Sequence, residues 1–380
     1  MGKIQLSIAD KNSLIARLVC FFWIIAKLIS WPVWLADRVF PLVPPFSFLT
    51  APAAVHAILY GLSLLTILAL LIFPGKRILQ VSIIVIDVLS CLLDQNRWQP
   101  WEYQYLFIFL ALFFNYKNEK NAAATIAFIF ITVYIFSGLS KINPAFAQSI
   151  RFQIIQLEVF PGKQWIYEWI TFHAGYVFGA IEFVLGIGLC FRATQRVSAI
   201  FLIIMHLLIL VAFGPFGLNY DHIIWPWNVL MILILYIYFV HRPFIKTNLK
   251  ALRTKWNLLI LLAFGILPAL NFFGYWDLFL SSSLFSNKTP DLYICIPKNT
   301  IPKDLEPYAL PGHKNFMCDS NSIFLNVRSW SFQELKSPAY PEIRVYKEIK
   351  KRLKERYPTM EGTFIIYEYK DGKKQRLELQ

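Results

Sequence analysis

Blocks of apolar residues, each about as long as a lipid bilayer is thick, recur along this sequence and restrict the folds open to it. An α-helix needs roughly 20 mostly apolar residues to cross the hydrocarbon core. With 57% hydrophobic and only 16% charged residues, the chain is too apolar for an average soluble globular protein. We therefore expect an all-α polytopic membrane helix bundle of about nine spans, with these approximate limits: 18–35, 52–73, 78–94, 104–116, 122–140, 172–191, 197–213, 223–240 and 256–274.

The first of these segments is the least regular, because Lys27 lies inside it and Pro32 lies near its end. It reads as a span, as an uncleaved signal anchor or as a helix in the membrane interface. Lys and Arg residues in the connections mark the cytoplasmic side. They gather on one side if the N-terminus is cytoplasmic, and HRPFIKTNLKALRTK (241–255) is the clearest marker. We expect a multi-pass protein of the inner or plasma membrane whose chain ends outside the cytoplasm.

The net charge of +14 is typical of basic residues beside membrane spans. It indicates membrane lipid as the neighbour of this chain and gives no support for a nucleic acid. The five cysteines include no CxxC pair, and no His/Cys cluster has the spacing of a zinc site. No metal site is expected.

The composition changes near residue 275, which divides a predicted transmembrane bundle (1–275) from a predicted α+β domain on the outer face (276–380). The stretches DLYICIPK and SIFLNVRSW are typical of strands, and YPEIRVYKEIKKRLKERYP is typical of an amphipathic helix. The stretch GTFIIYEYKDGKKQRLEL predicts a hairpin. Cys295 and Cys318 fall in this domain and could pair in an oxidising compartment.

The run YIFSGLSKIN ends one span with a group of reactive side chains. Tyr134, Ser137 and Lys141 share one helix face by their i, i+3, i+7 spacing. Gly138 allows another helix or a ligand to approach that face, and Pro144 predicts that the helix ends near Lys141. Two interpretations of the lysine stay open. Its amine could stretch to the lipid headgroups, or it could turn into a cavity where desolvation makes it a usable base.

The segment DQNRWQPWEYQY (94–105) predicts a polar outer loop. Asp94 and Arg97 are its candidate site residues. The aromatic side chains could contact a substrate or form an interfacial aromatic belt; they include Trp98, Tyr103 and Tyr105.

Other polar residues fall within or beside the spans, where a charged group is costly and suggests function. Asp87 lies near mid-bilayer, so we expect its carboxyl group to be protonated or matched with a cation. Glu182 and His206 lie on adjacent spans, where a hydrogen bond between them would satisfy both. Asp221 and His222 lie in a further outer loop, GPFGLNYDHIIW.

The run YIFSGLSKIN resembles the Tyr-Phe-x-Ala-Gly-x-x-Lys-Leu-Asp stretch of vitamin K-dependent γ-glutamyl carboxylases and the bacterial HTTM (horizontally transferred transmembrane) proteins. The matching positions are Tyr134, Gly138, Lys141 and Asn143. The similarity in layout extends over about residues 15–245. The Gly-x-x-Lys pattern also resembles DoxX-like and MauE-like membrane proteins. The family's Asn-His pair before Tyr-Leu falls here on Glu102-Tyr103 if the gap is kept, or on Tyr103-Gln104 if it slips by one, so the family histidine is missing.

The carboxylase resemblance implies an outward-facing enzyme in which the lysine amine deprotonates a reduced, vitamin K-like quinone. Oxygen then makes the quinol a strong base, a peptide glutamate loses its γ-proton and CO2 adds. It implies a quinone cofactor and a peptide or protein substrate on the outer face. We take Lys141, Tyr134, Asp94 and His206 as candidate catalytic residues, and these as candidate substrate-binding residues: Arg97, Trp98, Tyr103, Tyr105, Ser137, Glu182 and His222. The alternative is a DoxX-like, non-enzymatic membrane partner that supports redox or maturation of another protein.

Overall fold

The computed structural model describes residues 6–156, 164–214, 217, 219, 222–241, 245, 249–283, 286–311, 318–319, 321–370 and 373–379. The chain forms two compact units. The first contains Met1–Leu28, Leu62–Asp87 and Gln99–Asn287, and the second contains Ile29–Gly61, Val88–Trp98 and Lys288–Gln380. The boundary between them passes through three helices, so neither unit is one continuous stretch of chain.

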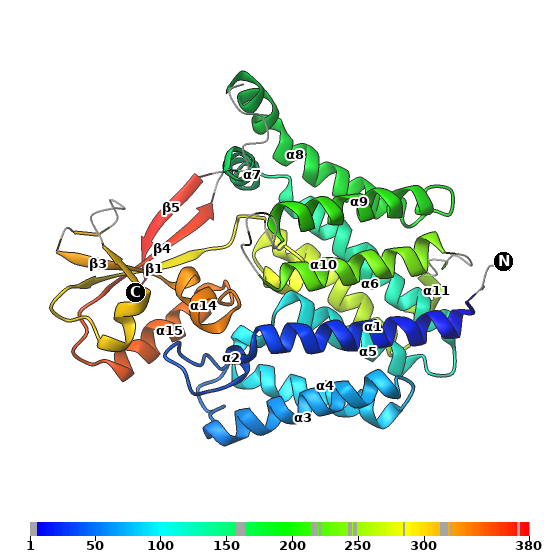
Figure 1. Cartoon of the computed structure of the whole chain (residues 1–380), viewed down its shortest axis with the longest axis horizontal. Coiled ribbons are helices and arrows are strands. Elements are labelled where there is room, and N and C mark those ends of the chain that lie inside the picture. Colours follow the sequence, from blue (N-terminus) through cyan, green and yellow to red (C-terminus); the bar gives the residue numbers. More distant parts are fainter. Residues whose placement is uncertain are drawn as a thin grey trace. The chain divides into compact units, whose positions relative to one another are not determined.

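Every apolar segment predicted to be helical is helical in the structure (Figure 1). The helices are α1 (Ile8–Ile29), α2 (Trp31–Trp34), α3 (Ala53–Ile72), α4 (Arg77–Leu93), α5 (Pro100–Phe114), α6 (Glu119–Lys141), α7 (Pro144–Gln156), α8 (Gln164–Gly188), α9 (Gln195–Phe213), α10 (Ile224–Leu235), α11 (Leu249–Leu252), α12 (Asn257–Leu261) and α13 (Leu267–Leu270). Two π-helical turns, Tyr236–Val240 and Leu262–Ile266, extend α10 and join α12 to α13.

Four of the described helices are long and apolar enough to cross a membrane: α1, α3, α6 and α9. Shorter apolar stretches follow at His173–Gly188, Ile224–Val240 and Asn257–Phe273. The count of nine spans and the orientation therefore stay predictions.

Helix α1 begins at Ile8, well before the predicted start near residue 18. The prediction followed the uninterrupted apolar run, which excludes Lys11. That lysine is buried and donates to the carbonyl oxygens of Ile237, at 2.6 Å, and His241, at 2.5 Å. Because a carbonyl at a helix C-terminus lacks an intrahelical donor, the amine satisfies groups at the end of the π-helical turn and is part of the packed helix.

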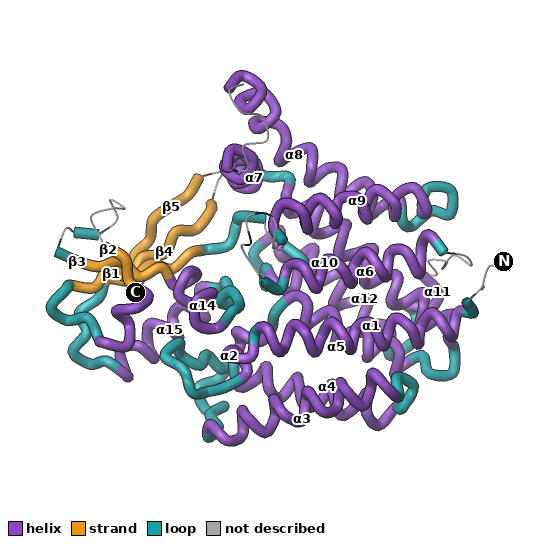
Figure 2. Tube along the Cα trace, in the orientation of Figure 1, coloured by secondary structure: helices purple, strands orange, loops and turns teal. Residues whose placement is uncertain are grey.

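A five-stranded antiparallel sheet lies in the second unit, with strand order β2-β3-β1-β4-β5 (Figure 2). The strands are β1 (Asp291–Pro297), β2 (Ala309–Pro311), β3 (Ser322–Asn326), β4 (Thr363–Lys370) and β5 (Lys373–Glu378). The predicted strand at 291–297 and the predicted hairpin of β4 and β5 are confirmed. The hairpin turn, Asp371-Gly372, lies outside the described residues.

The stretch SIFLNVRSW was only half correctly predicted as a strand. It forms β3 up to Asn326 and then helix α14 (Val327–Leu335). The side chain of Asn326 accepts a hydrogen bond from the backbone N–H of Ser329, which is the N-cap signal that ends the strand and starts the helix.

Helix α15 (Ile343–Arg356) confirms the predicted amphipathic helix. Its apolar face is buried, and the Tyr346 hydroxyl donates to the Pro290 carbonyl at 2.7 Å. Burial raises the pKa of Tyr346, so this phenol stays protonated and keeps donating. Elsewhere on α15, Arg352 and Glu348 form an ion pair at 2.8 Å.

Residues 29–61 and 88–98, which include parts of three helices and all of α2, belong to the same compact unit as the sheet. The predicted division at residue 275 did not contain this feature. The ring of Phe40 lies 4.6 Å from that of Trp330. The Glu334 carboxylate accepts hydrogen bonds from the backbone N–H groups of Val39 and Phe40. The side chain of Asn96 accepts one from Tyr340 N at 3.0 Å. These contacts hold residues 29–61 and 88–98 to α14 and its following loop.

Cys295 and Cys318 form the disulfide that the sequence left open. The bond ties β1 to a segment 23 residues later. In the chain-entropy account, a loop of this length stabilises the folded state by about 3 kcal/mol.

We expect the double variant Cys295→Ser/Cys318→Ser to unfold about 2–4 kcal/mol more easily than the native protein. Chemical denaturation in detergent checks this, with Cys190→Ser as the control outside the disulfide. The denatured, unreduced native protein should take up three maleimide labels, and five after reduction, because the chain has five cysteines. Uptake of five labels before reduction would contradict the disulfide.

Candidate functional site

Helices α6 and α8 approach each other closely, and this contact builds the candidate site. A Cβ atom on Gly138 would lie 2.3 Å from the backbone nitrogen of Phe183 and 2.8 Å from the carbonyl oxygen of Gly179. Any side chain at position 138 would force the two backbones apart. The predicted close approach at Gly138 is thus confirmed, and its occupant is a helix, as small residues allow at helix interfaces in membranes.

This contact brings Lys141 next to Glu182. The lysine nitrogen lies 2.6 Å from Glu182 Oε2 and 2.7 Å from Ser137 Oγ. The lysine side chain is 14% exposed and that of Glu182 is 7% exposed. The amine is therefore bound between two helices, and it does not extend alone toward headgroups. Helix α6 ends at Lys141 and α7 starts at Pro144, as the proline predicted.

Tyr134 lies two turns before Lys141 on α6 and forms a second polar group with α9 and α10. Its hydroxyl oxygen lies 2.7 Å from His206 Nε2. The other ring nitrogen, Nδ1, lies 2.5 Å from Asn228 Oδ1. All three side chains are buried. Hydrogen bonds of this kind satisfy polar groups that would otherwise be costly in an apolar interior.

The two groups are electrostatic neighbours. The Glu182 charge acts on both Tyr134 and His206, and the Lys141 charge acts on His206. The predicted Glu182–His206 hydrogen bond is wrong, because each residue has another partner. Both lie within apolar helical segments, and sequence spacing alone does not show which of several polar side chains there become partners. Asn228 was missed, although one amide inside the apolar run IIWPWNVLMILIL is a signal that the sequence offered.

Asp87 is matched with a cation, which is one of its two predicted states. The Lys27 nitrogen lies 3.1 Å from Asp87 Oδ2 and 3.5 Å from Glu102 Oε1, and all three side chains are fully buried. Trp23 Nε1 donates to Glu102 Oε2 at 2.6 Å. Lys27, which made the first predicted span irregular, is therefore the partner of Asp87 in the third predicted span. Glu102, which takes the place of the asparagine in one of the two alignments of the family's Asn-His pair, belongs to this ion set.

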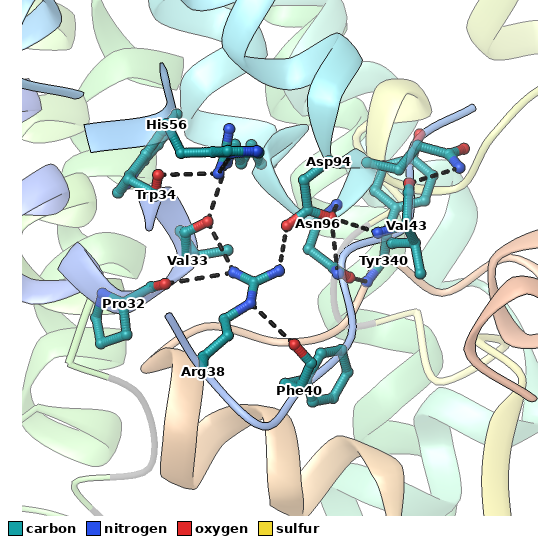
Figure 3. Close-up of polar contacts among 12 residues, drawn as sticks. Pro32, Val33, Trp34, Arg38, Phe40, Val43, His56, Asp94, Asn96 and Tyr340 are labelled. Atoms are coloured by element: carbon teal, nitrogen blue, oxygen red, sulfur yellow. Dashed lines mark hydrogen bonds and ion pairs between the residues drawn. The ribbon is translucent and has the colours of Figure 1, made fainter. Parts of the chain in front are cut away.

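Asp94 lies in the second unit and caps a short turn (Figure 3). Its carboxylate is buried, forms an ion pair with Arg38 and accepts hydrogen bonds from the backbone and side chain of Asn96, at 3.1 and 3.0 Å. The backbone N–H of Val43 also donates to it. The predicted loop 94–105 is wrong in its second half, because Pro100 begins α5, as proline at the first helical position often does.

Arg97 is fully buried in the same unit, and its guanidinium is taken up by the chain itself. It donates to the carbonyl oxygens of Val33, Ser90 and Trp34, at 2.9–3.0 Å, to Ser90 Oγ at 3.1 Å and to Nδ1 of His56 at 2.8 Å. Five acceptors on one planar group are a geometry that suits arginine. These contacts tie α2, α3 and α4 together and give the residue a structural role.

The remaining candidates are dispersed. Tyr103 and Tyr105 are buried on α5, where Tyr103 stacks on Phe264 and Tyr105 meets the edge of Trp23. Trp98 is half-buried after the short turn 95–97. His222 is exposed just before α10, and Asp221 lies outside the described residues.

Comparison with protein-family models, curated proteins and solved structures finds no match to this chain. Within the described residues, no group of three or more His, Cys, Asp or Glu side chains could hold a metal ion. The Lys141–Glu182 and Tyr134–His206 pairs each place two titratable groups within hydrogen-bonding distance, so that a proton could pass between them.

Proposed function

We propose that this chain is an integral membrane enzyme of the HTTM type. It removes a proton from a hydroxyl group of a lipid-soluble substrate, with Lys141 as the base. The observation that supports it most is the contact between the amine of Lys141 and the carboxylate of Glu182 in a mostly apolar helix interface. A reduced quinone is the substrate class that fits this donor set. Its hydroxyl groups can bind the lysine, serine and tyrosine side chains, and its ring suits the apolar surroundings.

The carboxylate supplies what a lysine base needs. Glu182 accepts a proton from the ammonium group of Lys141, which leaves a neutral amine. The amine then takes the proton of the bound hydroxyl, so that one proton ends on each residue. Ser137 Oγ accepts a hydrogen bond from the lysine nitrogen and so helps to fix its position beside Glu182. General base catalysis of this kind contributes about 10²–10⁴-fold to a rate.

Carboxylation of a peptide glutamate is not included in this function. The two alternative positions for the family histidine hold Tyr103, which stacks on Phe264, and Gln104, whose side-chain oxygen accepts a hydrogen bond from Trp227. Peptide or protein substrates on the outer face therefore stay a further expectation of the resemblance.

For the membrane topology, we propose a multi-pass bundle with the C-terminal residues outside the cytoplasm. Helices α1, α3, α6 and α9 are long and apolar enough for it, and the Lys/Arg bias gives the direction. The Cys295–Cys318 disulfide supports the outer location, since such bonds persist in oxidising compartments.

Replacing Lys141 with methionine tests the base. We expect the variant to fold and to lose at least about 100-fold of the ionisation of bound reduced naphthoquinone. Anaerobic absorbance spectroscopy of the protein in lipid nanodiscs measures it. Lys120→Met, an exposed lysine on the same helix, is the matched control. Ionisation by Lys141→Met equal to that of the native protein would rule out the base.

A second function is favoured by one feature of the same pair. The ammonium group of Lys141 is bound by Glu182 and Ser137, as it would be in a purely structural ion pair. This fits a DoxX-like membrane partner that supports redox or maturation of another protein. Cross-linking in native membranes that traps one specific protein, with Lys141→Met fully active in cells, would favour this function over the enzyme.

A further inference from the structure

The orientation of the Asn228 side-chain amide is fixed by its neighbours. One end of the amide lies 2.6 Å from the carbonyl oxygen of Ile224. A carbonyl oxygen can only accept, so this end is the NH2 group. The other end, Oδ1, therefore faces Nδ1 of His206, at 2.5 Å. The assignment follows from the donors and acceptors available to each group.

This orientation decides which nitrogen of His206 carries the proton. Because Asn228 Oδ1 can only accept, His206 Nδ1 must be the N–H donor. In a neutral imidazole the other nitrogen, Nε2, then holds a lone pair. The Tyr134 hydroxyl, 2.7 Å from Nε2, must donate to it. The hydrogen bonds therefore run in one direction, from Tyr134 through His206 and Asn228 to Ile224.

Burial of the ring opposes a positive charge on His206, as does the Lys141 ammonium group, whereas the Glu182 carboxylate favours one. Glu182 and Lys141 form an ion pair with each other. If the imidazole gains a proton, the nearby carboxylate offsets the new positive charge. The Asn228 oxygen keeps its hydrogen bond, because Nδ1 is protonated both before and after the transfer.

We propose that Asn228 is a positioning residue that holds His206 in the Nδ1–H form, so that Tyr134 and His206 act as a second proton-accepting pair beside Lys141. The Tyr134 O–H bond breaks and the His206 Nε2–H bond forms. The phenolate oxygen of Tyr134 can then take a proton from a hydroxyl group, and this last step rests on the function proposed above. The tautomer itself does not.

Nitrogen NMR of the histidine rings tests the proposal. The chain has six histidines, so the protein with ¹⁵N-labelled histidine gives few signals, and His206→Asn identifies those of residue 206. We expect Nδ1 to be protonated and Nε2 to be unprotonated at neutral pH. Detection of His206 as the Nε2–H form would overturn the proposal whatever Lys141 does.

Two variants separate positioning from packing. In Asn228→Leu the acceptor is absent, and we expect the ratio of Nδ1–H to Nε2–H to fall by at least about tenfold, the effect of a hydrogen bond contributing roughly 1.4 kcal/mol. In Asn228→Asp an oxygen still faces His206, so Nδ1 should stay protonated. An unchanged ratio in Asn228→Leu would exclude the positioning role. If that variant does not fold, loss of the Nδ1 proton in Asn228→Asp would exclude it as well.

The same spectra distinguish this inference from the proposed function. Lys141→Met should abolish ionisation of reduced naphthoquinone and leave His206 in the Nδ1–H form. If the native protein does not ionise the quinone but shows this tautomer, the proposed substrate is wrong and the inferred Tyr134–His206–Asn228 arrangement stands.

Discussion

Replacing Lys27 with methionine is expected to destabilise the helical unit by about 3–5 kcal/mol, because breaking a buried ion pair leaves a charge without a partner. The amine of Lys27 contacts both Asp87 and Glu102, and all three side chains are shielded from solvent. Without it, two carboxyl groups face each other in an apolar interior. Thermal unfolding in detergent, followed by circular dichroism, measures the loss.

Two controls show whether charge is the cause. The triple variant Lys27→Met/Asp87→Asn/Glu102→Gln has no charge in the set, and we expect it to recover most of the lost stability, since neutral replacement of a buried ion set is often tolerated. Lys120→Met, on an exposed site, should change stability by no more than about 0.5 kcal/mol. If Lys27→Met melts like the native protein, the ion set does not stabilise the fold.

The second large effect is expected at Arg97. Methionine at this position removes the donor of five buried acceptors: the carbonyl oxygens of Val33, Ser90 and Trp34, the hydroxyl of Ser90, and Nδ1 of His56. Each unsatisfied buried group costs about 1–3 kcal/mol. Allowing for partial relaxation, we expect a loss of about 4 kcal/mol in the free energy of unfolding, measured by denaturant titration.

Arg97→Lys is the matched control, because it keeps the charge and loses the planar fork. We expect it to be destabilised by about 2 kcal/mol, since an ammonium group has only three donors. If Arg97 instead binds a substrate, a different result is expected. In that case Arg97→Met would unfold like the native protein and would bind reduced naphthoquinone more weakly.

Local patterns in the sequence predicted the helices well and most of the sheet domain. Apolar runs, the proline at 144 and the period of the amphipathic helix at 343–356 are properties of neighbouring residues. The strand that became helix α14 shows the limit. Its apolar residues fit either structure, and the Asn326 cap decided the outcome.

Pairings between distant residues were not predictable in the same way. By its position in the sequence, Glu182 could bind either Lys141 or His206. The close approach of α6 and α8 at Gly138 is what brings the lysine to it. Likewise, no periodicity shows that residues 29–61 and 88–98 join the unit of the sheet. Those contacts come from backbone N–H groups and single polar side chains such as Glu334 and Asn96.

The ion set of Lys27, Asp87 and Glu102 has a consequence for biosynthesis. Translation delivers α1, with its buried ammonium group, before α4 and α5 bring the two carboxylates. In the membrane bundle proposed above, a lone charge at bilayer depth is costly, so α1 by itself would be unstable in lipid. We expect it in that case to stay beside the insertion machinery and to enter the hydrocarbon together with α4 and α5, so that the helices are buried in a different order from their synthesis.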